Sequence, residues 1–225
     1  MSAFFTQAIL IATFAAGIRL AVPLLLASLG ETYGQRSGVL NLGVDGIMLL
    51  GAFGGYYTVL KTDDVWLGLL VGVGVGLLLG LVSAVISVTL LAEQGISGIG
   101  IYLFGLGMSD LLFQKLVGTP IPIKKFPKLD IPGLSDIPWL GGMLFRHSII
   151  IYVAFALIPI SMFVINKTTF GMRIRSVGEN PEAADSVGVS VAKVRYATVT
   201  IGGVLAGVAG AALAIDLGIF QQNLT

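Results

Sequence analysis

The sequence predicts an all-α, polytopic integral membrane protein with about six membrane-spanning helices. Hydrophobic residues make up 56% of the 225-residue chain and charged residues only 11%, whereas typical soluble domains contain about 25% charged residues. The mean hydropathy is +0.96. Apolar stretches recur at the length of about 20 residues that crosses a hydrocarbon core. Because these stretches are continuous and do not alternate with polar residues, a β-barrel is excluded and helices are expected.

Each predicted span carries its own local signals. Pro23 should kink the first span without ending it, and Pro159 should bend the fifth. Trp66 is placed to anchor the start of the third span at a membrane interface. The six spans are expected at residues 3–29, 39–60, 66–91, 99–117, 148–165 and 196–220.

Glycines are expected to govern how these spans pack. The chain contains 31 glycines, and small residues let membrane helices approach closely. In the third span, Gly68, Gly72, Gly76 and Gly80 follow GxxxG spacing, so we expect a helix of the same subunit, and not a second copy, against this face. The polar residues 93–98 interrupt the chain before the fourth span, which suggests that this span is broken or re-entrant.

Polar groups within or beside the spans suggest further roles. Arg19 lies inside the first span, where a charge either faces a cavity or partner helix or snorkels to the interface. Asn41 and Asp45 are four residues apart and are expected to share a face of the second span. They should pin the start of that helix or line a path. His147 stands alone, so no metal site is predicted. The proline-rich stretch 118–147 should be largely irregular, apart from a short helix that its sequence allows before Trp139.

The polar interval 167–195 is predicted to carry a short, capped helix between two spans. Asn180 is suited to the N-cap, Pro181 to the first helical position, and Glu182 to the positive end of the helix dipole. Gly188 should end the helix. Basic residues flank it on both sides, so we expect a surface that contacts a partner, although an ordinary solvated loop has the same composition.

Two blocks of this sequence resemble the permeases of ATP-binding-cassette importers. The stretch GMRIRSVGENPEAAD from Gly171 to Asp185 resembles the EAA loop of the branched-chain permease family, particularly its nucleoside and simple-sugar uptake members. The stretch ETYGQRSGVLNLGVDGIM from Glu31 to Met48 resembles the N-terminal signature of the same family. The resemblance covers nearly the whole chain, which we take as one permease domain over residues 1–225. Relatives in this family continue beyond the point where this chain stops, so the domain is expected to lack its last segments.

The resemblance implies a function and a set of sites. The interval 167–195 would be a cytoplasmic coupling loop that faces a separate ATPase, and the small residues Ala183 and Ala184 would allow close approach to it. The residues implied in ATPase coupling are Gly178, Glu179, Asn180, Pro181, Glu182, Ala183, Ala184, Asp185 and Gly188. The residues implied in lining the solute path are Asn41, Asp45, Ser97, Tyr102 and Ser109.

The resemblance also implies partners. These are an ATPase subunit that binds ATP and Mg²⁺, a second permease subunit that is either a sibling or a second copy of this chain, an extracytoplasmic solute-binding protein or lipoprotein, and the lipid bilayer of the cell membrane. This chain itself is expected to bind no cofactor. The solute is expected to be a nucleoside or a simple sugar, and the residues do not choose between them.

Motifs that are absent narrow the function further. No GxxxxGK[ST] motif occurs, so the chain is not expected to hydrolyse ATP, and no HExxH or nucleophile-elbow motif indicates an enzyme. With no cysteine, disulfides and thiolate metal sites are excluded. A net charge of +1 argues against a nucleic-acid partner. Two alternatives remain open on the sequence: a secondary transporter, and a non-transporting assembly subunit or truncated permease.

Overall fold

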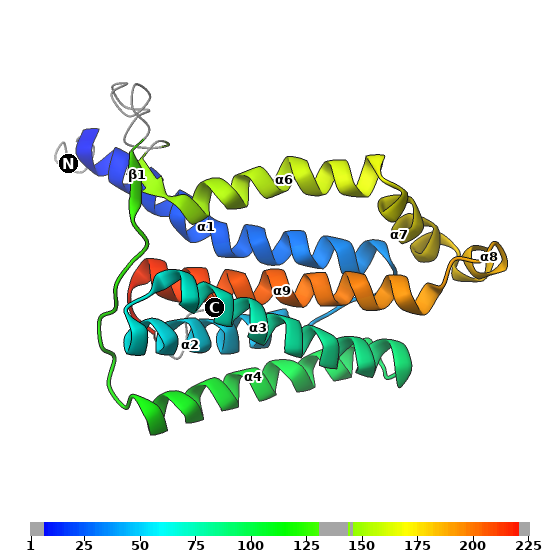
Figure 1. Cartoon of the computed structure of the whole chain (residues 1–225), viewed down its shortest axis with the longest axis horizontal. Helices are drawn as coiled ribbons and strands as arrows, with labels where there is room; N and C mark the ends of the chain where they lie inside the picture. The colour runs from blue at the N-terminus through cyan, green and yellow to red at the C-terminus, as the bar shows by residue number, and fades with distance from the viewer. Residues whose placement is uncertain (1–6, 131–143, 145, 221–225) are drawn as a thin grey trace, which may run out of the picture.

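The computed structural model describes residues 7–130, 144 and 146–220. These residues form a bundle of long helices with short elements at both of its ends (Figure 1). In chain order the elements are α1 (Gln7–Arg36), α2 (Val44–Thr62), α3 (Val65–Ala84) with a following π-helical turn η2 (Val85–Thr89), α4 (Gln94–Leu116), β1 (Lys128–Asp130), β2 (Arg146–Ser148), α6 (Ile149–Lys167), α7 (Thr169–Glu179), α8 (Pro181–Ser186) and α9 (Val191–Leu217).

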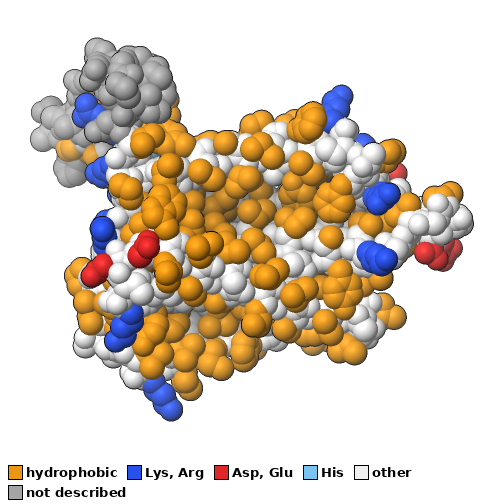
Figure 2. All heavy atoms as spheres, viewed as in Figure 1, with side chains coloured by type: hydrophobic (Ala, Val, Ile, Leu, Met, Phe, Trp, Pro, Cys, Tyr) orange, Lys and Arg blue, Asp and Glu red, His pale blue; other side chains and the backbone are white. Residues whose placement is uncertain are grey.

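Helix α9 forms the centre of the bundle. It packs on α1, α2 and α3, while α4 lies against α2 and α6 lies against α1 (Figure 1). Small residues make this possible, because most of the inward positions of α9 are glycine or alanine. Apolar side chains cover most of the visible surface along the helices, and charged side chains gather toward the two ends (Figure 2). This is the arrangement expected of helices surrounded by lipid.

Five helical segments among the described residues are long and apolar enough to cross a membrane. They are α1, α3 with η2, α4, α6 and α9. The predicted second span corresponds to α2, which does not meet this criterion. Its sequence carries Asp45 and Lys61 near its two ends. Most of its side chains are nevertheless buried, because α3, α4 and α9 surround it.

The first two helices have different boundaries from the spans predicted for them. Helix α1 continues to Arg36, beyond the predicted end at residue 29, and passes through Pro23 without ending. Helix α2 begins at Val44, so Asn41 lies in the preceding connection and shares no helical face with Asp45. The expectation that both residues lie in one span is therefore wrong. The Asn41 side chain instead accepts a hydrogen bond from the Gly43 N–H at 3.0 Å, forming a local turn.

The prediction of a broken or re-entrant fourth span is also wrong, because α4 is continuous from Gln94 to Leu116. The polar residues before it form a helix start. The Glu93 carboxylate accepts hydrogen bonds from the Gly95 and Ile96 N–H groups and caps the helix. These two bonds lower the pKa of Glu93 below its usual value. Within α4, Gly105 lies so close to Gly46 of α2 that an added Cβ would stand 2.2 Å from its carbonyl oxygen.

Gly72, Gly76 and Gly80 of α3 face α9 of the same chain, whereas Gly68 lies nearest to Gly55 and Val59 of α2. Gly68, Gly72, Gly76 and Gly80 are all buried, and a Cβ added to Gly76 would stand 2.4 Å from the carbonyl oxygen of Gly203. Gly74, on the same helix, is exposed and would meet nothing within 4 Å. The two helix backbones therefore touch along one stripe of α3, and the other side of that helix is open.

The end of the bundle near the N-terminus carries a short hairpin. Strands β1 and β2 pair antiparallel with Lys128 opposite Ser148, in a region that the proline content had predicted to be irregular. A short helix considered before Trp139 falls outside the described residues. Trp66, at the start of α3, packs edge-to-face against Phe126, which leads into the hairpin. The hairpin therefore covers one end of the helices, opposite the end that carries α8 (Figure 1).

Candidate functional site

Helix α8 forms as its local sequence predicts. The Asn180 side chain accepts a hydrogen bond from the Ala183 N–H at 3.0 Å, and Pro181 occupies the first turn. The helix ends at Ser186, and Gly188 follows with φ +85°. That left-handed conformation is readily available to glycine and disfavoured for other residues. The Val189 N–H then donates to the Ala184 carbonyl at 3.0 Å, which turns the chain toward α9.

Helix α7 supports α8, and the sequence interpretation missed it. Thr168 caps α7 by accepting a hydrogen bond from the Gly171 N–H at 3.1 Å. Ile174 and Val177 are fully buried on its inner side. The signal for this helix was present: a threonine cap followed by apolar residues at positions 170, 174 and 177, which is helical spacing. The surrounding charged residues obscured it.

The α7–α8 segment is held against the ends of α1 and α9 by close backbone contacts. A Cβ added to Gly178 would stand 2.1 Å from the Arg36 carbonyl oxygen, so the two chains touch at this point. Beside it, the Arg195 Nε donates to the Ser37 carbonyl at 3.2 Å. The Ser37 and Thr198 hydroxyls, both fully buried, are joined by a hydrogen bond of 2.8 Å. These contacts join α7 to the end of α1, and the end of α1 to α9.

Ala183 and Ala184, which were both expected to approach the ATPase, occupy different environments. Ala184 is 3% exposed and packs in an apolar cluster with Tyr33 of α1, Ile174 of α7 and Val194 of α9. Ala183 is exposed. Ala184 therefore anchors α8 within its own chain. The exposed surface of α8 and the residue after it consists of Glu182, Ala183, Asp185, Ser186 and Val187.

The residues predicted to line a solute path do not surround one cavity. Ser97 lines an apolar cavity of about 480 Å³ between α3 and α4. Asp45 is exposed on the first turn of α2. Tyr102 is half-buried, with its backbone against Gly46. Ser109 is buried, and its hydroxyl donates to the Leu106 carbonyl of its own helix.

Asn41 also has a local role, because its N–H donates to the Glu31 carboxylate at 2.9 Å. That bond ties the connection before α2 back to α1. Four of the predicted path residues come from neighbouring turns at the start of the α2–α4 contact, while Ser109 lies about 10 Å further along α4. The first four residues lie where α2 and α4 meet. These five side chains alone do not form a solute path.

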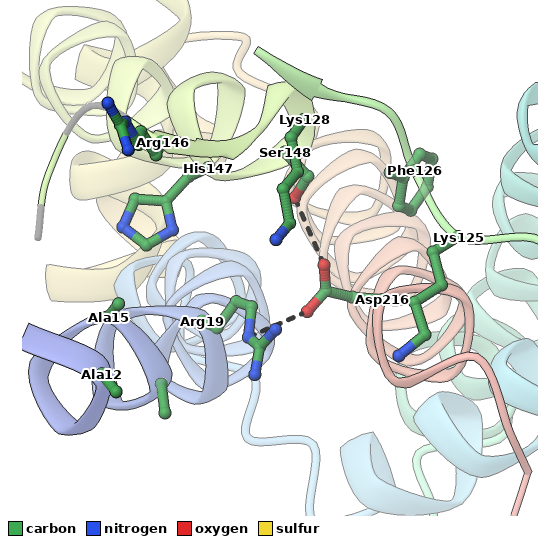
Figure 3. Close-up of a pocket in the computed structure, with 11 residues that line it drawn as sticks. Ala12, Ala15, Arg19, Lys125, Phe126, Lys128, Arg146, His147, Ser148 and Asp216 are labelled. Atoms are coloured by element: carbon green, nitrogen blue, oxygen red, sulfur yellow. Dashed lines mark hydrogen bonds and ion pairs between the residues drawn. The ribbon is translucent and has the colours of Figure 1, made fainter. Parts of the chain in front are cut away.

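A polar cavity of about 310 Å³ lies at the hairpin end of the bundle (Figure 3). Arg19 of α1 lines it, and its Nε lies 3.5 Å from Asp216 Oδ2 of α9. The other carboxylate oxygen, Asp216 Oδ1, accepts a hydrogen bond from the Ser148 hydroxyl at 3.4 Å. Arg19 thus faces both a cavity and a partner helix. No local sequence pattern pairs Arg19 with Asp216, because the two residues lie on different helices.

Nothing in the described part of the chain groups metal ligands together. No three His, Cys, Asp or Glu side chains among those residues lie close enough to hold an ion. His147 lies in β2 and is 4% exposed, beside the polar cavity.

Comparison with known proteins identifies relatives along most of the chain. The guanosine ABC transporter permease protein NupQ of Bacillus subtilis is 39% identical over 210 residues, which are 88% of this chain and 66% of the relative. The nucleoside ABC transporter permease protein NupC of Lactococcus lactis subsp. cremoris is 35% identical, over 84% of this chain and 62% of the relative. A Haloferax volcanii protein named provisionally as a glucose ABC transporter permease, TsgC13, is 40% identical, over 90% of this chain and 64% of the relative.

This chain thus spans about two thirds of the length of these relatives. No solved structure matches it significantly. Residues 13–225 match the model of a family described as the permease component of branched-chain amino acid transport systems. With its apolar spanning helices, this is a multi-pass protein of the cell membrane, and it belongs to that family of ABC transporter permease components.

Proposed function

We propose that this chain is the membrane-spanning permease part of an ATP-binding-cassette importer. The observation that carries the proposal is the construction of α8: a rigidly capped helix that projects from one end of the bundle and exposes most of its side chains (Figure 1). A projecting helix with a defined shape is suited to contact a separate protein. The family membership supports an ATPase subunit as that protein, and this end of the bundle would then face the cytoplasm.

The outer and inner surfaces of α8 have different roles in coupling: one contacts the ATPase and the other contacts the spans. The outer surface, with Glu182, Ala183 and Asp185, would sit against the ATPase. The inner surface is Ala184, buried among residues of α1, α7 and α9. Because packed elements move as units and do not deform continuously, displacement of α8 would shift the ends of α1 and α9. ATP-driven closure of the ATPase could thereby shift the equilibrium between outward-open and inward-open arrangements of the spans.

We propose a nucleoside or a simple sugar as the solute. The names of the relatives in Bacillus subtilis and Lactococcus lactis, which specify guanosine and nucleosides, support a nucleoside, and the Haloferax volcanii name supports a sugar. An extracytoplasmic binding protein or lipoprotein would deliver the solute, and a second permease subunit would complete the path. ATP and Mg²⁺ would be bound by the ATPase and not by this chain.

Substitution on the outer surface of α8 tests the ATPase contact. Ala183→Arg places a long cation on the exposed surface and should abolish co-purification with the ATPase and ATP-driven uptake, while the protein remains monodisperse in detergent. Ala184→Arg is a weaker test, because a buried arginine would disrupt the packing of α8 itself.

Ala192→Arg is the matched control, since Ala192 is exposed at the same end of the bundle, in the first turn of α9. It should retain both binding and uptake. Normal ATP-coupled uptake by the Ala183→Arg protein would contradict the docking surface. Solute-stimulated ATP hydrolysis in the reconstituted complex would distinguish an importer from a secondary transporter or a non-transporting subunit.

A further inference from the structure

The polar cavity at the hairpin end of the bundle has an unusual concentration of positive charge. Its lining includes four cationic side chains, Arg19, Lys125, Lys128 and Arg146, together with the imidazole of His147. The only carboxylate in that described lining is Asp216. None of these groups belongs to the α8 surface or to the proposed solute-path residues.

The single carboxylate is already engaged on both of its oxygens. Asp216 Oδ2 lies 3.5 Å from Arg19 Nε, and Oδ1 accepts a hydrogen bond from Ser148. The Arg19 Nε is buried but makes no hydrogen bond with any described residue. In Figure 3 the Lys128 side chain points from the hairpin toward Arg19 and Asp216, and the His147 ring lies on the α1 side of the same space. Among the described residues, positive charge thus exceeds negative charge around this cavity.

The position of the cavity along the helices matches the boundary of a membrane. At a rise of about 1.5 Å per residue, Arg19 lies about 26 Å along α1 from Arg36, and Asp216 lies about 32 Å along α9 from Arg195. The hydrocarbon core is about 30 Å thick. If the arginines at the α8 end mark one boundary, the cavity lies at the opposite boundary, at the depth of the lipid headgroups.

The chemistry of the lining suits a phosphate group. A guanidinium presents a planar fork of donors that matches phosphate oxygens, and ammonium groups add point charges around it. The volume, about 310 Å³, lies at the small end of the range for ligand sites. Ala12, Ala15 and Phe126 provide an apolar wall beside the cations, which suits the glycerol portion of a lipid or of a small phosphate ester.

We propose that this cavity binds a phosphate ester, supplied either by the headgroup of an anionic phospholipid or by a small soluble molecule. The site is separate from α8, so the test of this proposal is independent of the test of the ATPase contact. Its occupation would join the hairpin to α1 through one anion, since these elements supply Lys128 and Arg19. Arg19 is in turn paired with Asp216 of α9.

Lipid binding to the full chain, purified in detergent, tests the proposal. Native mass spectrometry and thermal unfolding would be measured with phosphatidylglycerol, diacylglycerol, glycerol 3-phosphate and oleate. Phosphatidylglycerol should bind and stabilise the protein, and diacylglycerol, which has no phosphate, should not. Lys128→Gln should weaken phosphatidylglycerol binding about fivefold, the effect of one cation near an anionic lipid surface. Lys124→Gln is the control, because Lys124 is exposed in the same segment but does not line the cavity.

The soluble probe identifies the source of the phosphate. Binding of phosphatidylglycerol alone assigns the site to a lipid headgroup, and binding of glycerol 3-phosphate with the same Lys128→Gln sensitivity assigns it to phosphate esters generally. Equal loss of affinity in the Lys124→Gln control would overturn the proposal, as would binding of oleate as tight as that of phosphatidylglycerol, which would indicate a carboxylate partner such as an acidic protein.

The contribution of Arg19 is tested in a charge-balanced background. Arg19→Gln alone leaves Asp216 without its partner and could disturb folding. The double variant Arg19→Gln/Asp216→Asn removes both charges. It should keep the unfolding temperature of the unliganded protein and lose the stabilisation by phosphatidylglycerol. Undiminished stabilisation of the double variant would exclude Arg19 from the site.

Discussion

Replacement of one glycine in α3 tests the close contact between α3 and α9. In Gly76→Ala the new Cβ would lie 2.4 Å from the Gly203 carbonyl oxygen and 3.0 Å from the Cα atoms of Val204 and Gly207. All three neighbours are backbone atoms, so no flexible side chain can move away. Restoring an ordinary contact of at least 3.4 Å requires the two helices to separate by about 1 Å locally.

The expected cost follows from that separation. A radial gap of 0.5–1 Å already forfeits about a quarter to a half of the dispersion attraction between packed atoms, and overpacking in a tight interface typically costs about 1–3 kcal/mol. Alanine also favours a helix over glycine by about 1 kcal/mol in water. Gly74→Ala shares that gain but introduces no contact, since nothing lies within 4 Å of its Cβ. The two variants should therefore differ by about 2 kcal/mol.

Thermal unfolding in detergent, followed by fluorescence-detected size-exclusion chromatography, measures this difference. For a chain of this size the Gly76→Ala protein should unfold about 4–8 °C below the Gly74→Ala protein. Gly74→Ala should match or slightly exceed the unchanged protein. Equal unfolding temperatures for the two variants would refute the close approach of α3 and α9, and a lower temperature for Gly74→Ala would place a partner on the side of α3 that we describe as open.

Three smaller perturbations test local contacts. Asn180→Ala should destabilise α8 by about 1 kcal/mol, seen as faster hydrogen exchange at Ala183, and unchanged exchange would exclude the cap. The pKa of Glu93 is lowered, so its cap on α4 should be complete above its ordinary pKa and lost as pH falls through the lower folded value. Exchange protection in the first turn of α4 should report that loss, and Glu93→Gln, which cannot titrate, should abolish this pH dependence. Thr198→Val should cost about 1 kcal/mol in thermal unfolding by removing the buried bond to Ser37; a neutral result would show that bond contributes nothing.

The candidate coupling site was predictable in outline because its signals are local. An N-cap residue bonds to an amide three positions away, and a terminating glycine is selected by its own φ angle, so Asn180 and Gly188 could be assigned from neighbours alone. The environment of Ala184 could not be assigned in this way. Its burial depends on Tyr33 and Val194, which come from other helices, and no local pattern distinguishes it from the exposed Ala183.

The fourth span was misjudged for a related reason. Polar residues and glycines before residue 99 resembled a break, yet the Glu93 carboxylate begins a regular helix there. Two glycines of α4 are positions where it contacts neighbouring segments, Gly98 against Leu42 and Gly105 against Gly46. The low helix propensity of glycine thus predicts a break in the helix, whereas its small size allows a close contact between two helices. Which of the two applies depends on the residue that packs against it.

Composition and local pattern alone were enough to establish a membrane-embedded helical chain with a short capped helix near its C-terminal third, because hydropathy and capping depend on residues close together in sequence. Only the folded arrangement paired Arg19 with Asp216, buried Ala184, and assembled the basic cavity from α1, α9 and the hairpin. Those features join residues far apart in the chain, and their proximity is determined by which helix packs against which.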